Sequence, residues 1–164
     1  MIVVSNTSPI LNLSIVKQWD ILEQLYQKVL IPDSVSQELW ECEHRNSAKG
    51  KLLPILVSEW IERQVVINQY LVNQLKLELD AGEAEAIALA LEKKSDILLI
   101  DERRGRKVAS RFGLNYIGTL GILIEAKHKG LITAIKPIVD NLIIEAGFWI
   151  KNDLYDKFLQ VAGE

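Results

Sequence analysis

The segment DAGEAEAIALALEKKSDILLID, residues 80–101, decides the fold expected for this chain. Asp80 and Glu83 have the spacing of a capping box, which marks the start of a helix. Residues 84–91 are apolar on nearly every side of that helix, a pattern typical of helices buried between other elements. Residues 96–100 follow as a continuous apolar run, as in a strand that is covered on both faces. A buried helix that leads into a buried strand predicts an α/β fold.

Outward from this segment, strands and helices are expected to alternate. Apolar and β-branched runs predict strands at residues 2–5, 28–31, 60–67 and 96–100 and around Tyr116. Helical spacing predicts helices around 10–15, around 19–25 and over 68–79. Further helices are expected to begin at Pro32, directly after Asp101 (ending at about Phe112) and at Thr119, and the tail 135–162 is expected to be helical with a break at Gly147. Polar residues predict a loop at 43–51. Ser8 is expected to cap the first helix, with Pro9 at its first position. This alternation favours a single domain over residues 1–164, a three-layer α/β fold with a mainly parallel central sheet flanked by helices.

The composition limits the classes of protein to consider. The chain has 164 residues, 49% hydrophobic and 25% charged, which suits one ordinary globular domain. Cys42 is the single cysteine, so an internal disulfide and a cysteine-based metal cluster are excluded, and a reducing, cytoplasmic location is expected. No apolar stretch has the roughly 18 to 20 residues needed to span a bilayer. A net charge of -3 gives no bulk attraction to a polyanion, so any nucleic-acid binding requires a local basic patch.

Two polar residues directly follow expected strands, Asn6 after the first and Asp101 after the run at 96–100. In an open parallel sheet, ligands bind outside the carboxyl ends of the strands, so both residues are expected to face one crevice. Short connections would bring Glu38 and Glu83 to the same edge. Carboxylates that lie close together repel one another, and a hard cation with oxygen ligands relieves that repulsion. These residues therefore predict a site for Mg²⁺ or Mn²⁺.

A basic segment follows Asp101 directly. Arginine forks match phosphate oxygens, and cations beside an acidic site let a phosphodiester backbone approach a chain of negative net charge. The segment therefore predicts a nucleic-acid-binding surface. Its residues are Arg103, Arg104, Arg106, Lys107 and Arg111.

Each of these residues also has an ordinary structural explanation. Glu83 fits a capping box with Asp80, and Asp101 serves equally well as the N-cap of the next helix. Asn6 supports a helix start through an Asx-turn, and Glu38 suits a solvated helix face. The basic segment can be an exposed helix face without a ligand. None of these patterns is specific when it is taken alone.

Several ordered blocks of the chain resemble the PIN-domain family, in particular its toxin ribonuclease subgroup. They are VVSNTSP at residues 3–9, LDAGEAEAIALA at 79–90, LLIDERRGR at 98–106 and GTLG at 118–121. Their order along the chain makes the resemblance more specific than any single block. It implies a parallel-sheet nuclease fold and, for many members, a ribonuclease that uses Mg²⁺ or Mn²⁺ and is the toxin of a bacterial or archaeal toxin–antitoxin pair.

The resemblance implies a set of catalytic residues and metal ligands, which maps onto Asn6, Glu38, Glu83 and Asp101. Position 6 departs from the pattern, because the family has Asp there and this chain has the neutral amide. Asn6 offers an oxygen but no full charge, so metal binding and activity are expected to be weaker. Glu102, in preference to Glu85, is the nearby acid expected to compensate. Ser8 and Thr119 are expected to support the site through hydrogen bonds.

The favoured function is an endoribonuclease that acts on RNA as the toxin of a pair with a small antitoxin protein. The resemblance also implies a homodimer, and no membrane partner is expected. The alternative is a catalytically weak or inactive PIN-like module that binds RNA or a protein, and Asn6 supports this alternative. A third hypothesis is a phosphotransfer domain that uses Asp101, but the first strand lacks the acidic cluster that would hold Mg²⁺ for that chemistry.

Overall fold

The sheet consists of short parallel strands whose carboxyl ends meet at one edge. The computed structural model describes residues 1–45 and 52–164, and within them five strands pair in the order β3-β2-β1-β4-β5. The strands are β1 (Val3–Ser5), β2 (Val29–Pro32), β3 (Ile61–Gln64), β4 (Ile97–Leu99) and β5 (Tyr116–Ile117). Every pairing is parallel, and β1 lies beside β4 with Val3 opposite Ile97 and Ser5 opposite Leu99. The residues that follow β1 and β4 are therefore neighbours.

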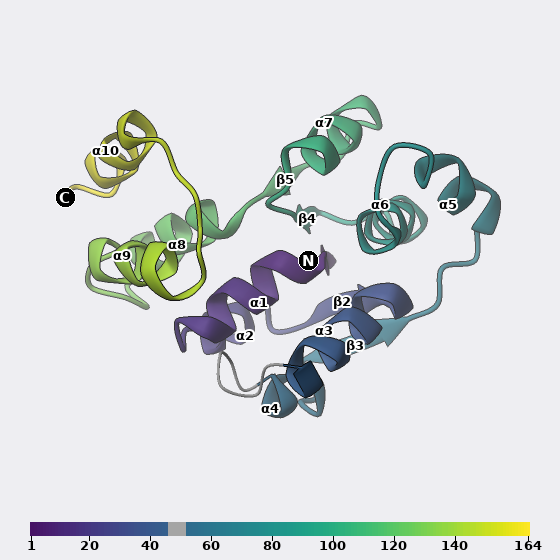
Figure 1. Cartoon of the computed structure of the whole chain (residues 1–164), viewed down its shortest axis with the longest axis horizontal. Coiled ribbons are helices and arrows are strands. Elements are labelled where there is room, and N and C mark those ends of the chain that lie inside the picture. The colour runs from purple at the N-terminus through teal and green to yellow at the C-terminus, as the bar shows by residue number, and fades with distance from the viewer. Residues whose placement is uncertain (46–51) are drawn as a thin grey trace.

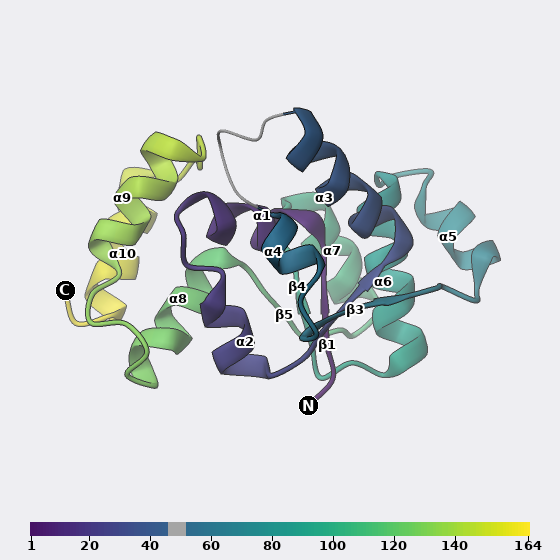
Figure 2. The same ribbon diagram turned by 90° about the horizontal axis from the view of Figure 1, so that it is seen from below.

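Helices cover both faces of the sheet. They are α1 (Thr7–Ile15), α2 (Asp20–Tyr26), α3 (Asp33–Arg45), α4 (Leu53–Leu56), α5 (Gln69–Leu75), α6 (Ala81–Lys93), α7 (Arg103–Arg111), α8 (Thr119–His128), α9 (Lys136–Glu145) and α10 (Asn152–Val161). Figures 1 and 2 show α5 and α6 at one end of the molecule, α9 and α10 at the other, and α1 between them. None of the described helices is both long enough and apolar enough to cross a membrane.

Alternating side chains of the strands contribute to two separate cores. Val3 and Leu99 belong to a core formed with α1, α2, α3, α8 and α9. Val4 and Leu98 belong to a second core, formed with α5, α6 and α7. Because successive residues of a strand point to opposite faces, this alternation assigns the helices to two layers. The expected three-layer α/β fold is confirmed, and its sheet is parallel throughout the described residues.

Helix α6 lies inside the second core, as the sequence predicts. The Asp80 carboxylate accepts a hydrogen bond from the Glu83 N–H at 2.8 Å, which satisfies one of the donors that a helix start leaves free. Every residue from Gly82 to Ala90 is buried. Lys94 ends the helix in the left-handed conformation, with φ 50°. The helix thus buries its whole circumference between the sheet and its neighbours.

The first helix begins earlier than expected. Asn6 occupies the N-cap position of α1 and the helix starts at Thr7, so the prediction that Ser8 caps this helix is wrong. The Ser8 hydroxyl instead donates to the Glu102 carboxylate. The sequence gives no signal for α4, because four residues are too few to show a helical period. The loop expected at 43–51 falls mostly outside the described residues, and its first three residues complete α3.

Replacing Ile87 by Ala in α6 is expected to lower the free energy of unfolding by about 2–5 kcal/mol, because this fully buried side chain leaves a cavity. Ile144→Ala is the matched control. Ile144 on α9 is 76% exposed, so its replacement should change the free energy of unfolding by at most about 0.5 kcal/mol. Urea unfolding followed by circular dichroism measures both variants. Equal losses would contradict the placement of α6 in the core.

Candidate metal centre

Asn6 is fixed at the edge of the sheet by its own backbone. Its N–H donates to the Leu99 carbonyl at 2.9 Å, which extends the pairing of β1 with β4 by one residue. Asn6 is 3% exposed, and its Nδ2 donates to Glu102 Oε2 at 3.0 Å. Among the described residues, no group donates to the buried Asn6 Oδ1. A buried oxygen without a partner is costly unless a cation or a water molecule binds it.

Asp101 follows β4, and three donors hold its carboxylate. Oδ1 accepts from the Thr119 N–H at 2.7 Å, and Oδ2 accepts from Thr119 Oγ1 at 2.7 Å and from Asn12 Nδ2 at 3.0 Å. The Asp101 carbonyl accepts from Arg106 Nε at 3.0 Å and from its Nη2 at 2.7 Å. The N-cap position of α7 belongs to Glu102, so the ordinary explanation of Asp101 as that N-cap is wrong. Sequence reasoning missed Asn12, a polar residue on an otherwise apolar turn of α1.

Glu38 extends from α3 towards the first turns of α1 and α6. It accepts a hydrogen bond from Thr7 Oγ1. Like Asn12, Thr7 is a residue of the site that sequence reasoning missed. A Cβ atom at Gly82 would lie 2.7 Å from Glu38 Oε1, so glycine is needed for the carboxylate to approach α6 this closely. Burial raises the pKa of Glu38 and the charge of Asp80 adds to the rise, while hydrogen bonds from Thr7 and the Gly82 backbone oppose it. Glu38 is therefore not the solvated helix residue of the ordinary explanation.

Glu83 is the acid whose environment least favours a charge. It is 7% exposed, and its Oε2 has no donor in the part of the chain that the structure describes. Burial raises the pKa of Glu83 to about 8, and a hydrogen bond to the Asp80 carboxyl and the charges of Asp80 and Glu102 contribute further. A Cβ atom at Gly105 in α7 would lie 2.9 Å from Oε2, so a glycine leaves room beside this oxygen. The capping explanation describes Asp80 well but leaves the buried Glu83 carboxyl unexplained.

Glu102 lies with these acids, whereas Glu85 faces another part of the fold. The Glu102 carboxylate accepts from Asn6 Nδ2 and from Ser8 Oγ, which directs it towards the start of α1. Glu85 accepts from Ser34 Oγ at 2.5 Å and so stabilises the first turn of α3. Glu102 is therefore the acid that stands beside the amide of Asn6.

The acids gather at one edge of the sheet without forming a ligand set as they are placed. Within residues 1–45 and 52–164, no three acidic, histidine or cysteine side chains are arranged to hold a metal ion. Hydroxyl and amide donors hold the carboxylates of Glu38, Asp101 and Glu102. The donor set nevertheless fits a hard cation, because every candidate ligand is an oxygen and two buried oxygens, Asn6 Oδ1 and Glu83 Oε2, lack donors.

The remaining basic residues of α7 fall into two groups. Arg111 pairs with Glu78 Oε2 at 2.8 Å, and Arg104 donates to the Glu78 carbonyl at 3.1 Å, so both attach α7 to the segment before α6. Arg103 and Lys107 are exposed, and their side chains form no such hydrogen bond or ion pair with the described residues. These two cations are the best placed to meet a phosphate backbone.

The raised pKa of Glu83 is expected to make stability depend on pH. Glu83 titrates at about 8 in the fold against an ordinary value of 4.5, so the folded state holds this proton more tightly than the unfolded state. Its contribution to stability is full below the unfolded pKa and is lost as the pH rises through the folded pKa. Thermal unfolding in EDTA should therefore show a Tm that falls between about pH 5 and pH 9.

Glu83→Gln is expected to reduce this fall in Tm, because the substituted amide does not titrate. Glu62→Gln is the control: a hydrogen bond from Lys28 lowers the pKa of Glu62, so this residue titrates below the tested range. The same fall in Tm in Glu83→Gln as in the unchanged chain would mean that Glu83 is not the group responsible.

Comparison with known families agrees with this architecture. Residues 2–164 match a family model described as a PIN domain. No curated protein matches the chain. The matched region contains all the strands and helices described above, and with them Asn6, Glu83 and Asp101. Because the match covers almost the entire sequence, the chain belongs to the PIN-domain family.

Proposed function

We propose that this chain is a PIN-type endoribonuclease that depends on Mg²⁺ or Mn²⁺. The observation that carries the proposal is the pair of buried oxygens without donors, Asn6 Oδ1 and Glu83 Oε2, at an edge rich in carboxylates. PIN domains are in general nuclease-like. Oxygen ligands beside the exposed cations of α7 suit the hydrolysis of a phosphodiester.

Some residues of the site would bind the metal ion, and others would orient the carboxylates that bind it. The metal would be held by Glu83 and Asp101, with Glu38, Glu102 and the neutral Asn6 as further ligands. A bound ion supplies Lewis-acid chemistry, polarising a phosphate and lowering the pKa of water. Thr119 and Asn12 keep the Asp101 oxygens oriented, and Thr7 does the same for Glu38. A ligating carboxylate is ionised, so binding must displace the proton that Glu83 holds below about pH 8.

The biological role that we propose is that of a toxin, acting on RNA in the cytoplasm and held inactive by a small antitoxin protein. We also propose a homodimer. Both parts rest on the resemblance of the sequence blocks to toxin ribonucleases. Exposed apolar side chains on α9 and α10, such as Ile144 and Val161, are compatible with contact to another chain.

A second candidate function is a PIN-like module that binds RNA or a protein without cutting RNA. The neutral Asn6 favours this candidate, because it removes one charge from the expected ligand set. The position of Glu102 favours the nuclease, because its carboxylate lies 3.0 Å from Asn6 Nδ2 and restores a charge next to the altered position. Metal binding is the property that separates the two.

Mn²⁺ binding by calorimetry is the first measurement. Asn6→Asp is expected to bind Mn²⁺ about tenfold more tightly than the unchanged chain or better, because it adds a negative charge to the site. Glu83→Gln is expected to weaken binding by about tenfold or more. Glu85→Gln is the matched control, since Glu85 is a similarly buried acid on α6 that serves α3. Its affinity for Mn²⁺ should equal that of the unchanged chain.

Cleavage of a single-stranded RNA, with Mn²⁺ and with EDTA, completes the comparison. Mn²⁺-dependent cleavage by the unchanged chain that Glu83→Gln abolishes would support the nuclease. Cleavage by Asn6→Asp alone would identify the second candidate. If neither the unchanged chain nor Asn6→Asp binds Mn²⁺ or cuts RNA, the nuclease proposal is refuted.

The RNA surface is tested by salt dependence. Arg103→Gln and Lys107→Gln are each expected to weaken RNA binding and to reduce the slope of log K against log salt by about 0.7 to 1, because each removes one phosphate contact. Lys28→Gln is the control, since Lys28 precedes β2 at the opposite edge of the sheet and pairs with Glu62 at 2.8 Å. Fluorescence anisotropy in EDTA measures binding without cleavage. A slope that none of the variants changes would exclude α7 as the RNA surface.

A further inference from the structure

A cavity of about 230 Å³ opens directly beside the candidate metal centre. Asp101 and Arg106 line the end nearest the acids, and Tyr116 of β5 lines one wall. The opposite wall comes from the C-terminal segment, with Phe148 before α10 and Phe158 within it. The lining residues come from separate parts of the chain, and Figure 1 shows β5 and α7 on one side and α10 on the other. The cavity is therefore formed only when the C-terminal segment is folded against β5 and α8.

The walls of this cavity combine aromatic and aliphatic side chains. The aromatic ones are Tyr116, Phe148 and Phe158, and the aliphatic ones are Ile117, Leu120 and Leu154. No residue of α10 is fully buried, and its Phe158 packs against the first core while it remains partly exposed and lines the cavity. Tyr116 is 39% exposed at the edge of the sheet. Aromatic faces of this kind are the usual stacking partners of unpaired nucleobases, and such stacking tolerates any base.

The end of the cavity near Asp101 is polar and carries both a carboxylate, that of Asp101, and a guanidinium, that of Arg106. The Asp101 carbonyl accepts two hydrogen bonds from Arg106, which fixes the plane of the guanidinium. A guanidinium has five N–H donors, so others remain for a phosphate or a base edge. Leu120 and Gly121 also line the cavity, and they belong to the first turn of α8, where backbone N–H groups lack intrahelical acceptors. Donors at one end and aromatic rings along the walls match the two halves of a nucleotide.

We propose that this cavity binds one unstacked nucleobase of a single-stranded RNA, next to the phosphate held at the candidate metal centre. The inference deepens the proposed nuclease function and rests on it for the position of that phosphate. Pockets for drug-sized ligands begin at about 300 Å³, so a smaller cavity suits a single planar base. The shared Asp101 makes the base site continuous with the metal centre and favours RNA over a protein side chain as its occupant.

The test compares RNA oligonucleotides of about ten nucleotides with an abasic oligonucleotide of the same length. Binding is measured by fluorescence anisotropy in EDTA, so that no RNA is cut. Tyr116→Leu is expected to weaken binding of oligouridylate and oligoadenylate about fivefold or more, because it removes a stacking ring but keeps apolar bulk. Binding of the abasic oligonucleotide should be unchanged. Phe158→Leu is expected to have the same effect and provides the test if Tyr116→Leu does not fold.

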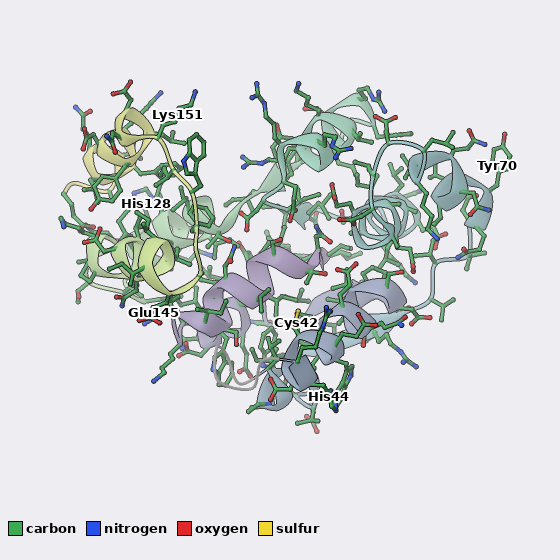
Figure 3. All side chains as sticks on the ribbon, viewed as in Figure 1. Cys42, His44, Tyr70, His128, Glu145 and Lys151 are labelled. Atoms are coloured by element: carbon green, nitrogen blue, oxygen red, sulfur yellow. The ribbon has the colours of Figure 1, made fainter. Side chains whose placement is uncertain are left out.

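Tyr70→Leu is the matched control. Tyr70 is 77% exposed and projects from α5 at the end of the molecule opposite to α10, as Figure 3 shows. Its replacement should leave the affinities for all three oligonucleotides unchanged. A thermal unfolding curve for each variant establishes that the fold is intact.

The outcomes separate this proposal from the nuclease proposal. If base-bearing oligonucleotides lose affinity in the cavity variants while no Mn²⁺-dependent cleavage is found, the base site stands and the nuclease fails. If the unchanged chain binds the abasic oligonucleotide as tightly as the others, the base site is refuted even where cleavage is observed. Equal losses for base-bearing and abasic RNA in Tyr116→Leu would also refute it and would leave the cavity to an apolar side chain of a protein partner.

Discussion

The pairing of β1 with β4 is the contact on which the candidate site depends. The Asn6 N–H donates to the Leu99 carbonyl at 2.9 Å, so the residue after β1 is tied to the end of β4 and lies next to the residues that lead to Asp101. A slip of one residue would exchange the faces of every side chain in the strand. Val4 would then leave the core around α6, and that core therefore fixes the register. Apolar packing in this way decides where the polar residues meet.

The edge defined by this register concentrates carboxylates in a poorly solvated place. Three of them are held by hydroxyl or amide donors, and each of the three accepts one hydrogen bond from a side chain of α1. Glu83 has no such donor at Oε2, and its raised pKa reflects burial and the acids around it. Asn6 reduces the repulsion in this group, since its amide donates to Glu102 where an aspartate would repel it. This hydrogen bond stabilises the carboxylate edge in the absence of a cation.

The C-terminal segment packs against the first core through partly buried side chains such as Phe148 and Phe158, and it completes the surface beside the site. Helix α10 lies against α8, and its Phe158 faces the cavity that begins at Asp101. The side chain of Glu164, at the end of this segment, accepts from Lys127 Nζ at 2.8 Å and from the Ile135 N–H at 2.8 Å. These hydrogen bonds hold the segment to α8 and α9. The cavity, whose lining combines residues 101–121 with Phe148, Leu154 and Phe158, is thereby kept next to the acids.

The sequence by itself determined the α/β class, the positions of most strands and helices, and the residue types of an oxygen-rich site. It did so because long apolar runs, capping residues and ordered blocks are local properties, clearest from Asp80 to Asp101. Only the tertiary structure decided which side chains form hydrogen bonds with one another. Ser8 and Glu102 are 94 residues apart, Asn12 and Asp101 are 89 apart, and Ser34 and Glu85 are 51 apart. The sequence offered both Glu102 and Glu85 as nearby acids, with Glu102 preferred. Strand register and helix rotation, which depend on packing over the whole chain, place Glu102 beside Asn6 and direct Glu85 to Ser34.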